Sequence, residues 1–568
     1  MFRPGLASVT LAVLVILLTG CMDSGLDEKS APKAADSPIS EPVTQDKLAE
    51  DKRIYERDND TSVDTLYLTV LEGDKQEGEA PLTWYELNRI RSRMEEGSLN
   101  AILQEGAADG SGPASGSFGY SSQEANAHVS LRGNSTRYAS QRSYKIKLND
   151  LAGLWNDQRT INLNKHAYDP SRLRNKLSFD LFETIPNITS LRTRFVHLYV
   201  KDLSEGGAAN SKPFIDYGLY TQIEQPNKQF LKNHWLDPYG QLYKATMFEF
   251  FEYQGELRLQ DDPLYDKAKF ETRLQINGRE DHRKLLDMLK DVNNLSIPIN
   301  EVIDKHFDLD NYLTWMASNI LMDNMDTNTQ NFLLYSPLNS EKWYFLPWDY
   351  DGGWELQQNS ANIITYSSGI SNYWGSKLHN RFFRNMENVN LLKDKIDELY
   401  RDYINNDIIS KRVALYAPIT QLYTSKQPDK GFLPELFSDV PKDLATISTV
   451  PERSMKRFIE DIQKPKPFFL DDLHQEGTTS VFQWDASFDL QGDTLNYDFT
   501  LARDPQFTKV VKRISTPGTS VRLSGLSPGT YYWKVTAADG KGHSQIAFDI
   551  YYDGEGTAYN GVREVKVN

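Results

Sequence analysis

The fold of this chain is decided at residues 343–352, which read Trp343-Tyr344-Phe345-Leu346-Pro347-Trp348-Asp349-Tyr350-Asp351-Gly352. The first half of this segment is aromatic and apolar, which is typical of a buried strand. The strand runs directly into two acidic residues, Asp349 and Asp351. We therefore expect the end of this strand to present two carboxylates beside a buried core.

A second segment with acidic and amide side chains precedes this strand. It reads Asp323-Asn324-Met325-Asp326-Thr327-Asn328-Thr329-Gln330-Asn331-Phe332-Leu333-Leu334-Tyr335, so Asn331 follows Asp326 by five positions and opens another apolar strand. The spacing resembles the D-x-x-x-x-N loop of protein kinases, in which the Asp accepts the hydroxyl proton and the Asn holds a metal. On its own, the pattern also arises where Asp and Asn cap loops. Because Asp349 lies 23 residues after Asp326, two strand–loop elements can bring three oxygen-bearing side chains together.

Further segments accompany this pair in a fixed order along the chain. They are Leu131-Arg132-Gly133-Asn134-Ser135-Thr136, Arg142-Ser143-Tyr144-Lys145-Ile146-Lys147-Leu148, the segment from Asp169 to Glu183, Tyr217-Gly218-Leu219-Tyr220-Thr221-Gln222-Ile223-Glu224, and Pro347-Trp348-Asp349-Tyr350-Asp351. In this combination the chain resembles the CotH kinase family, whose members look like secreted, highly diverged relatives of protein kinases. The resemblance covers residues 63–460 and implies a two-lobed, kinase-like domain.

The resemblance also implies roles for particular residues. Asp326 would orient or deprotonate the acceptor hydroxyl. Asn331 and Asp349 would hold Mg²⁺ or Mn²⁺ against the phosphates of ATP, and Asp351 would add a ligand. The acceptor would be a Ser or Thr hydroxyl in a protein.

Two lysines on a predicted strand are candidates for contact with the ATP phosphates. Alternation along residues 143–148 places Lys145 and Lys147 on one face of the strand. By resemblance this strand supplies the phosphate lysine, and we choose Lys147, which lies nearer the strand end. The alternative is an edge strand guarded by solvated lysines. The turn at Gly133 would replace the glycine-rich loop with a single glycine, so Arg132 would help to grip phosphate.

The acidic partner of the phosphate lysine stays open. A helix is expected at residues 171–183, where leucines recur every four residues. Kinases place a helical glutamate against the lysine, and Glu183 or Asp180 would serve. The family resemblance gives an equal claim to Glu224, which ends a predicted strand. The alternative for Glu224 is a surface acid on an edge strand.

Helical periodicity marks the middle of the chain. Apolar residues at three- and four-residue spacing predict helices at residues 283–292 and 310–325, and further helices are expected at 391–409 and 456–462. The second helix runs directly into the Asp326 loop, as a helix of the kinase C-lobe leads into its catalytic loop.

Composition limits the classes of protein that the chain can represent. With 568 residues, of which 39% are hydrophobic and 12% aromatic, it can bury a large core. The formal net charge of −16 and the lack of a long basic run argue against nucleic-acid binding. The histidines form no H-x-x-x-H or Cys/His cluster in the sequence, so zinc is not expected.

The N-terminal residues predict export and lipid attachment. Arg3 supplies a positive charge, and the apolar run at residues 6–18 is too short for a permanent membrane span. The ending Leu18-Thr19-Gly20-Cys21 resembles a bacterial lipobox. This resemblance implies cleavage between Gly20 and Cys21 and attachment of lipid to the Cys21 thiol. This would anchor the protein outside the cytoplasm, at the outer membrane if the cell has one. Residues 22–62 are poor in aromatics and dense in charged residues, Ser and Pro, so we expect a disordered tether.

The composition changes after Lys464-Pro465-Lys466-Pro467, which we interpret as a hinge between a kinase-like domain at 63–464 and a module at 468–568. The run Leu526-Ser527-Pro528-Gly529-Thr530-Tyr531-Tyr532-Trp533-Lys534-Val535 resembles a fibronectin type III domain, an all-β immunoglobulin-like sandwich. Such a module more often positions or binds than catalyses. Strands are expected at 480–484, 495–502, 520–523, 531–537 and 544–551.

Taken together, these features predict an α+β protein: an extracytoplasmic, lipid-anchored, kinase-like domain followed by a sandwich. We expect it to transfer the ATP γ-phosphate to Ser or Thr of surface or matrix proteins. One alternative is a non-catalytic scaffold for envelope or matrix assembly, against which the convergence of Asp326, Asn331 and Asp349 argues. The other is a kinase acting on a carbohydrate or envelope polymer, and the sequence leaves protein and glycan acceptors equally open.

Overall fold

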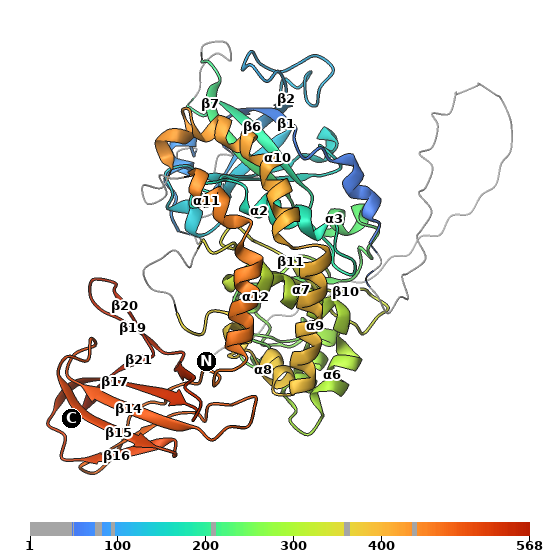
Figure 1. Ribbon diagram of the computed structural model, residues 1–568. Coiled ribbons are helices and arrows are strands. Elements are labelled where there is room, and N and C mark those ends of the chain that lie inside the picture. The colour runs from blue at the N-terminus through green and yellow to red at the C-terminus, as the bar shows by residue number, and fades with distance from the viewer. Residues whose placement is uncertain are drawn as a thin grey trace, which may run out of the picture. The chain divides into compact units, whose positions relative to one another are not determined.

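The computed structural model describes residues 48, 50–73, 82–92, 97–205, 212–356, 364–433 and 440–567 (Figure 1). All of them belong to one compact unit, Pro42–Asn568. The expected export segment, with Cys21, lies outside the described residues, as does most of the expected tether. Within the described ranges, no helix combines the length and apolar character that crossing a membrane requires.

The first part of the described chain is a closed barrel of seven strands in the order β1-β2-β3-β4-β5-β7-β6. Parallel pairing of β1 with β6 closes the barrel, and the other neighbours pair antiparallel. Inward-facing side chains such as Leu68, Val129 and Ile146 form one apolar core. The strands are β1 (Val63–Val70), β2 (Ser98–Glu105), β3 (Ala127–Arg132), β4 (Ser143–Leu148), β5 (Thr160–Asn164), β6 (Thr193–Asp202) and β7 (Ile215–Glu224).

A second part combines a four-stranded sheet, in the order β11-β10-β8-β9, with most of the helices. One large apolar core joins the sheet to the helices. The strands are β8 (Gln241–Ala245), β9 (Leu274–Ile276), β10 (Phe332–Ser336) and β11 (Tyr344–Pro347). The helices are α1 (Trp84–Leu87), α2 (Arg174–Phe182), α3 (Lys228–Asn233), α4 (Lys267–Glu271), α5 (Arg283–Asn293), α6 (Ile299–His306), α7 (Leu309–Leu321), α8 (Lys377–Phe383), α9 (Met386–Asp402), α10 (Asn406–Thr424), α11 (Val440–Ile447) and α12 (Val450–Asp461).

The structure contains the predicted helices, with different bounds and one break. Helices α2, α5, α7 and α12 correspond to the expected segments, but α2 begins at Arg174 rather than at 171 and α7 ends at Leu321 rather than at 325. The segment expected at 391–409 belongs to two helices, because α9 ends at Asp402 and Asn405 caps the start of α10 through its side chain. Helix α10 contacts both α2 and β7, so it joins the helical part to the barrel (Figure 1). The mixed α+β class is confirmed.

The ordered fold begins earlier than expected. A 3₁₀ helix, η1 (Lys52–Arg57), buries Ile54 and Tyr55. Asp58 pairs with the buried Arg192 of the segment before β6 at 2.7 Å. A tether that extends to residue 62 is therefore too long, because two apolar side chains and one paired aspartate within this charged segment dock on the domain.

The last part contains two main sheets that share one core and a separate two-stranded sheet. Side chains from both sheets, including Phe482, Phe499 and Trp533, meet in it. A three-stranded sheet contains β12 (His474–Glu476), β13 (Thr479–Gln483) and β16 (Ser520–Ser524). A five-stranded sheet contains β14 (Asn496–Ala502), β15 (Val510–Thr516), β17 (Gly529–Ala538), β18 (Ser544–Ile546) and β21 (Val562–Val567), and β19 (Ile550–Tyr552) pairs with β20 (Ala558–Asn560).

The segment interpreted as a hinge is packed rather than open. Lys466 is fully buried, and its ammonium group donates to the backbone oxygen of Asp461. Beyond it, Phe488 stacks on Trp374, and the Tyr366 hydroxyl donates to the backbone oxygen of Phe548. The two proline residues therefore lie in a segment that is held against α12 and its neighbours.

Candidate active site

Two adjacent strands carry the candidate residues to one end of the four-stranded sheet. Strands β10 and β11 pair antiparallel, with Phe332 opposite Pro347. Asn331 immediately precedes β10, and Asp349 follows β11 by two positions. The register therefore brings these two side chains to the same edge of the sheet.

Asp326 lies in a 3₁₀ turn, η4 (Met325–Thr327), which follows helix α7. Its Oδ1 accepts a hydrogen bond from Gln330 Nε2 at 2.6 Å, and its Oδ2 accepts one from Asn331 Nδ2 at 2.8 Å. The two residues of the D-x-x-x-x-N pattern are thus in direct contact. Because Asn331 donates through its nitrogen, its side-chain oxygen is the atom left to face a cation.

The backbone at this edge is held in an unusual conformation. Asn331 and Asp349 both have left-handed φ angles, 57° and 60°. Asn and Asp tolerate this region better than most residues, and such outliers concentrate at ligand-binding sites. The left-handed turn after Trp348 separates Asp349 from the buried strand that precedes it.

Three carboxylates form one electrostatic cluster at this edge. Burial raises the pKa of Asp349 to about 7, and the negative charges of Asp351 and Asp326 raise it further than burial alone would. Burial also raises the pKa of Asp326, with a contribution from Asp351. All three residues stay partly exposed. Excess negative charge in an accessible, half-buried position is the pattern expected of a functional site rather than of a structural ion pair.

Two cationic residues flank these acids. Arg132 lies at the end of β3. Burial lowers its pKa to about 10, although the negative charges of Asp349 and Asp351 act to raise it. Its guanidinium carbon lies 5.3 Å from the centre of the Trp348 ring, and Lys244 Nζ lies 5.1 Å from the same ring. The charge of Lys244 also opposes the rise in the Asp349 pKa. Both cations therefore lie on the Trp348 ring close to the acids.

A histidine also lies beside these acids. His166 Nδ1 lies 3.5 Å from Asp351 Oδ2, and its Nε2 is buried without a hydrogen-bond partner among the described residues. From the sequence we expected only that the histidines bind no zinc, and none was placed at this site. His166 and Lys244 were missed because neither belongs to a recognisable motif, and only the folded chain places them beside the acids.

The strand register changes our choice between the two lysines. In the pairing of β3 with β4, Arg132 lies opposite Ser143, Ser130 opposite Lys145, and His128 opposite Lys147. Each step of two residues advances about 7 Å along a strand, so Lys147 lies about 14 Å from the row of Arg132 and Lys145 about 7 Å. The strand end nearest Lys147 points away from the acids. Lys145 is the better placed of the two.

Glu224 faces away from these lysines. Ile161 of β5 lies opposite both Ile146 and Glu224, so Glu224 shares the inward face of Ile146 rather than the outer face of Lys145. Its Oε2 lies 2.8 Å from His234 Nε2. The interpretation of Glu224 as the partner of a phosphate lysine is therefore not supported by the register.

Asp180, a helical candidate for the same role, is also paired with other residues. Asp180 Oδ2 lies 2.9 Å from Lys176 Nζ and accepts a hydrogen bond from the Tyr416 hydroxyl at 2.6 Å. Asp180 Oδ1 accepts a bond from the Thr193 hydroxyl. Burial and the charge of Asp180 raise the pKa of Glu183 well above its ordinary value, which indicates a carboxyl without a strong cationic partner.

A protein-family model matches the part of the chain that contains this site. Residues 129–462 match the family model described as CotH kinase protein. The chain belongs to the CotH family. The matched region contains the candidate site residues Asp326, Asn331, Asp349, Arg132 and Lys145.

Two relatives of known name are similar to this CotH chain. Inner spore coat protein H of Bacillus subtilis (strain 168) is 26% identical over 231 residues, which cover 40% of this chain and 58% of the relative. Invasin CotH3 of Rhizopus delemar is 24% identical over 227 residues, which cover 34% of this chain and 38% of the relative. The chain thus spans less than two thirds of either relative's length.

Proposed function

We propose that this CotH protein is an extracytoplasmic, ATP-dependent kinase that phosphorylates Ser or Thr side chains of surface or matrix proteins. The observation that carries the proposal is the direct contact between Asp326 and Asn331 beside the half-buried Asp349. This is the spatial arrangement that phosphoryl transfer needs, namely a group for the acceptor hydroxyl next to ligands for a metal. The barrel and the helical part would be the two lobes of a diverged kinase.

The donor set fits a hard divalent cation. Asn331, Asp349 and Asp351 offer amide and carboxylate oxygens, which Mg²⁺ and Mn²⁺ prefer. Bound there, the metal would supply charge neutralisation for the β- and γ-phosphates of ATP. The raised pKa of Asp349 supports this fit, because burial and the neighbouring acids outweigh the partial compensation by Lys244 and Arg132.

The remaining side chains would position the reactants. Asp326 would accept a hydrogen bond from the acceptor hydroxyl and take its proton, while Gln330 and Asn331 hold the carboxylate in place. Arg132, Lys145 and Lys244 would contact the phosphates. Fixing donor and acceptor in line supplies much of the rate enhancement in this class of reaction.

We also propose that lipid on Cys21 anchors the protein outside the cytoplasm, and that the last part is a fibronectin type III module. The names of the two relatives, a spore coat protein and an invasin, belong to proteins outside the cytoplasm and support this location. The two sheets with one shared core support the module. A scaffold role is the second candidate, and a carbohydrate or envelope polymer is the alternative acceptor.

The test is transfer of label from γ-labelled ATP to isolated envelope fractions. Wild type and the Asp472→Asn control, which changes an exposed aspartate of the last part, should label an acceptor equally. Asp326→Asn should bind nucleotide but not transfer label. Protease digestion of the labelled product should release the label if the acceptor is a protein, and glycan hydrolysis should release it if the acceptor is a polymer. Equal labelling by wild type and Asp326→Asn would favour the scaffold.

A further inference from the structure

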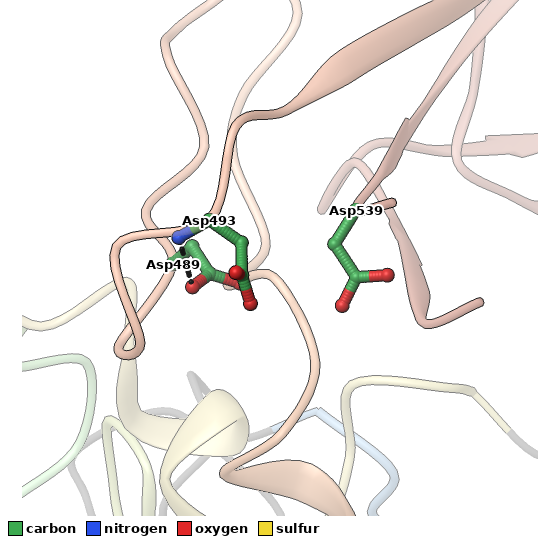
Figure 2. Close-up of side chains that lie close together, drawn as sticks. All are labelled: Asp489, Asp493 and Asp539. Atoms are coloured by element: carbon green, nitrogen blue, oxygen red, sulfur yellow. Dashed lines mark hydrogen bonds between the residues drawn. The ribbon is translucent and has the colours of Figure 1, made fainter. Parts of the chain in front are cut away.

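A second group of acids lies far along the chain, in the last part. Asp489 and Asp493 lie in the segment between β13 and β14, and Asp539 follows β17. One carboxylate oxygen from each lies within 4.8 Å of the others. Figure 2 shows the carboxylates of Asp489 and Asp493 side by side, with that of Asp539 turned toward them across a gap.

Backbone hydrogen bonds fix two of these carboxylates. Asp489 Oδ1 accepts bonds from the backbone nitrogens of Gln491 and Asp493, both at 2.9 Å. Asp539 Oδ1 accepts bonds from the backbone nitrogens of Lys541 and His543 at 2.8 and 2.9 Å. The oxygens are therefore held before any ligand arrives, which lowers the conformational entropy that binding must overcome.

The second carboxylate oxygen of Asp489 is buried and unpaired in the part of the chain that the structure describes. Asp489 is only 8% exposed, and its Oδ2 has no hydrogen-bond partner among the described residues. A buried carboxylate oxygen without a partner is costly, and native proteins supply a donor, a water or an ion at such positions. The side chain of Asp539 is fully buried as well. This orphaned oxygen points to a cation between the two segments.

Two basic residues of the protein, Lys541 and His543, contact the cluster. Lys541 Nζ lies 2.8 Å from Asp493 Oδ2, and its side chain is 59% exposed. His543 Nδ1 lies 2.7 Å from Asp539 Oδ2. An exposed lysine can swing into solvent when a divalent cation enters, so Lys541 reduces affinity without blocking the site.

We propose that Asp489, Asp493 and Asp539 form a calcium site that ties the β13–β14 segment to the turn after β17. Ca²⁺ accepts all-oxygen donor sets of variable geometry and completes its shell with backbone carbonyls and water. Mg²⁺ demands a near-ideal octahedron and gives up its water reluctantly, so it suits three carboxylates on two separate segments less well. The proposal stands apart from the kinase activity, because it uses none of the residues of the candidate active site.

Calorimetric titration of the purified protein with Ca²⁺ tests this proposal. Wild type should bind Ca²⁺ with a dissociation constant of about 10⁻⁴ to 10⁻³ M, the range of extracellular modules, and should unfold at a higher temperature when Ca²⁺ is present. Asp489→Asn and Asp493→Asn should each weaken binding by about tenfold or more, since each removes one charged ligand. Asp498→Asn, a charge-matched change at an exposed position of β14, should bind like wild type.

Two further variants separate the possible outcomes. Asp349→Ala should keep this Ca²⁺ binding, which distinguishes it from metal bound at the candidate active site. Lys541→Gln should bind Ca²⁺ more tightly than wild type, because the competing ammonium is gone. The proposal is overturned if neither wild type nor Lys541→Gln binds millimolar Ca²⁺, or if binding survives unchanged in Asp493→Asn. The partly exposed Asp493 keeps the test valid even if Asp489→Asn fails to fold.

Discussion

The surroundings of two groups of acids in this CotH protein shift their pKa values in opposite directions. Asp169 is almost fully buried, yet its pKa is held below its ordinary value because Arg174, 2.6 Å away, outweighs the effect of burial. Asp349 is more exposed, yet burial and neighbouring acids raise its pKa to about 7. The fold pairs Asp169 with a strong cationic partner, whereas it compensates the charge of Asp349, which we assign to function, only in part. This difference is a better guide to the site than exposure alone.

The largest effect is expected at the acids whose charge is only partly compensated. Asp349→Ala should abolish metal-dependent nucleotide binding, and Asp326→Asn should lower the transfer rate by about 10²–10⁴ while nucleotide binding persists. Asp349→Asn removes the charge but keeps a side chain suited to the left-handed φ of this residue, so it should leave the thermal unfolding temperature unchanged or raise it. Calorimetry and rate measurements on these variants check the statements. A large loss of stability in Asp349→Asn would break the comparison.

The compensated acids should behave in the opposite way. Arg174→Ala leaves both Asp169 and Asp443 without their cationic partner, since Arg174 Nη1 lies 2.6 Å from Asp169 Oδ1 and Nη2 lies 2.6 Å from Asp443 Oδ1. Breaking such a buried group costs about 3–5 kcal/mol of unfolding free energy. Denaturant unfolding measures the loss. The exposed Arg401→Ala, which removes a surface pair with Asp402, is the control and should change stability by less than about 1 kcal/mol.

A buried histidine, His234, makes the free energy of unfolding depend on pH. His234 Nδ1 lies 2.5 Å from Glu50 Oε1, and its Nε2 lies 2.8 Å from Glu224 Oε2. The Tyr55 hydroxyl is 3.4 Å from the ring, and Lys52 pairs with Glu50. Burial alone would lower the pKa of His234, but the charges and hydrogen bonds of the two glutamates raise it to about 9.

Because the folded-state pKa lies above the unfolded value, this stabilisation is complete below about pH 6.5 and is lost as the pH rises through 9. The shift corresponds to about 3 kcal/mol at its full extent. We expect the free energy of unfolding to fall across this window, and His234→Gln to remove most of the dependence. A wild-type stability that stays constant between these pH values would contradict the protonated state of His234.

The smallest effect is expected at the two lysines of β4, Lys145 and Lys147. Lys145→Ala should raise the KM for ATP by about tenfold, the equivalent of about 1.4 kcal/mol, because the register places it one row from Arg132. Lys147→Ala, two rows away, should change the KM by less than about twofold. The two variants remove the same charge from the same strand, so each is the control of the other. The reverse order would restore the choice made from the sequence.

The sequence predicted what depends on local pattern. Leucine spacing located α2, alternation located β4, and the order of acidic and amide residues predicted that Asp326, Asn331 and Asp349 would converge. What failed depends on register between strands. Glu224 lies on the inward face only because Ile161 pairs with both it and Ile146, and no single segment carries that information.

Other features escaped prediction because they arise between distant segments. Lys244 reaches the site because β8 pairs with β10, and His166 reaches it through a left-handed turn after β5. The docking of Ile54 and Tyr55 was hidden by the charged residues around them. Pattern reveals what one segment prefers, whereas these contacts depend on which other segment lies beside it.

The docked N-terminal segment has a mechanical consequence. Glu50 meets the buried His234, Tyr55 packs edge-on against the His234 ring, and Asp58 meets Arg192 just before β6 begins. A pull on the chain from before Glu50 would have to break these three contacts before it reached β1. The pairing of β1 with β2 and β6 would then resist it.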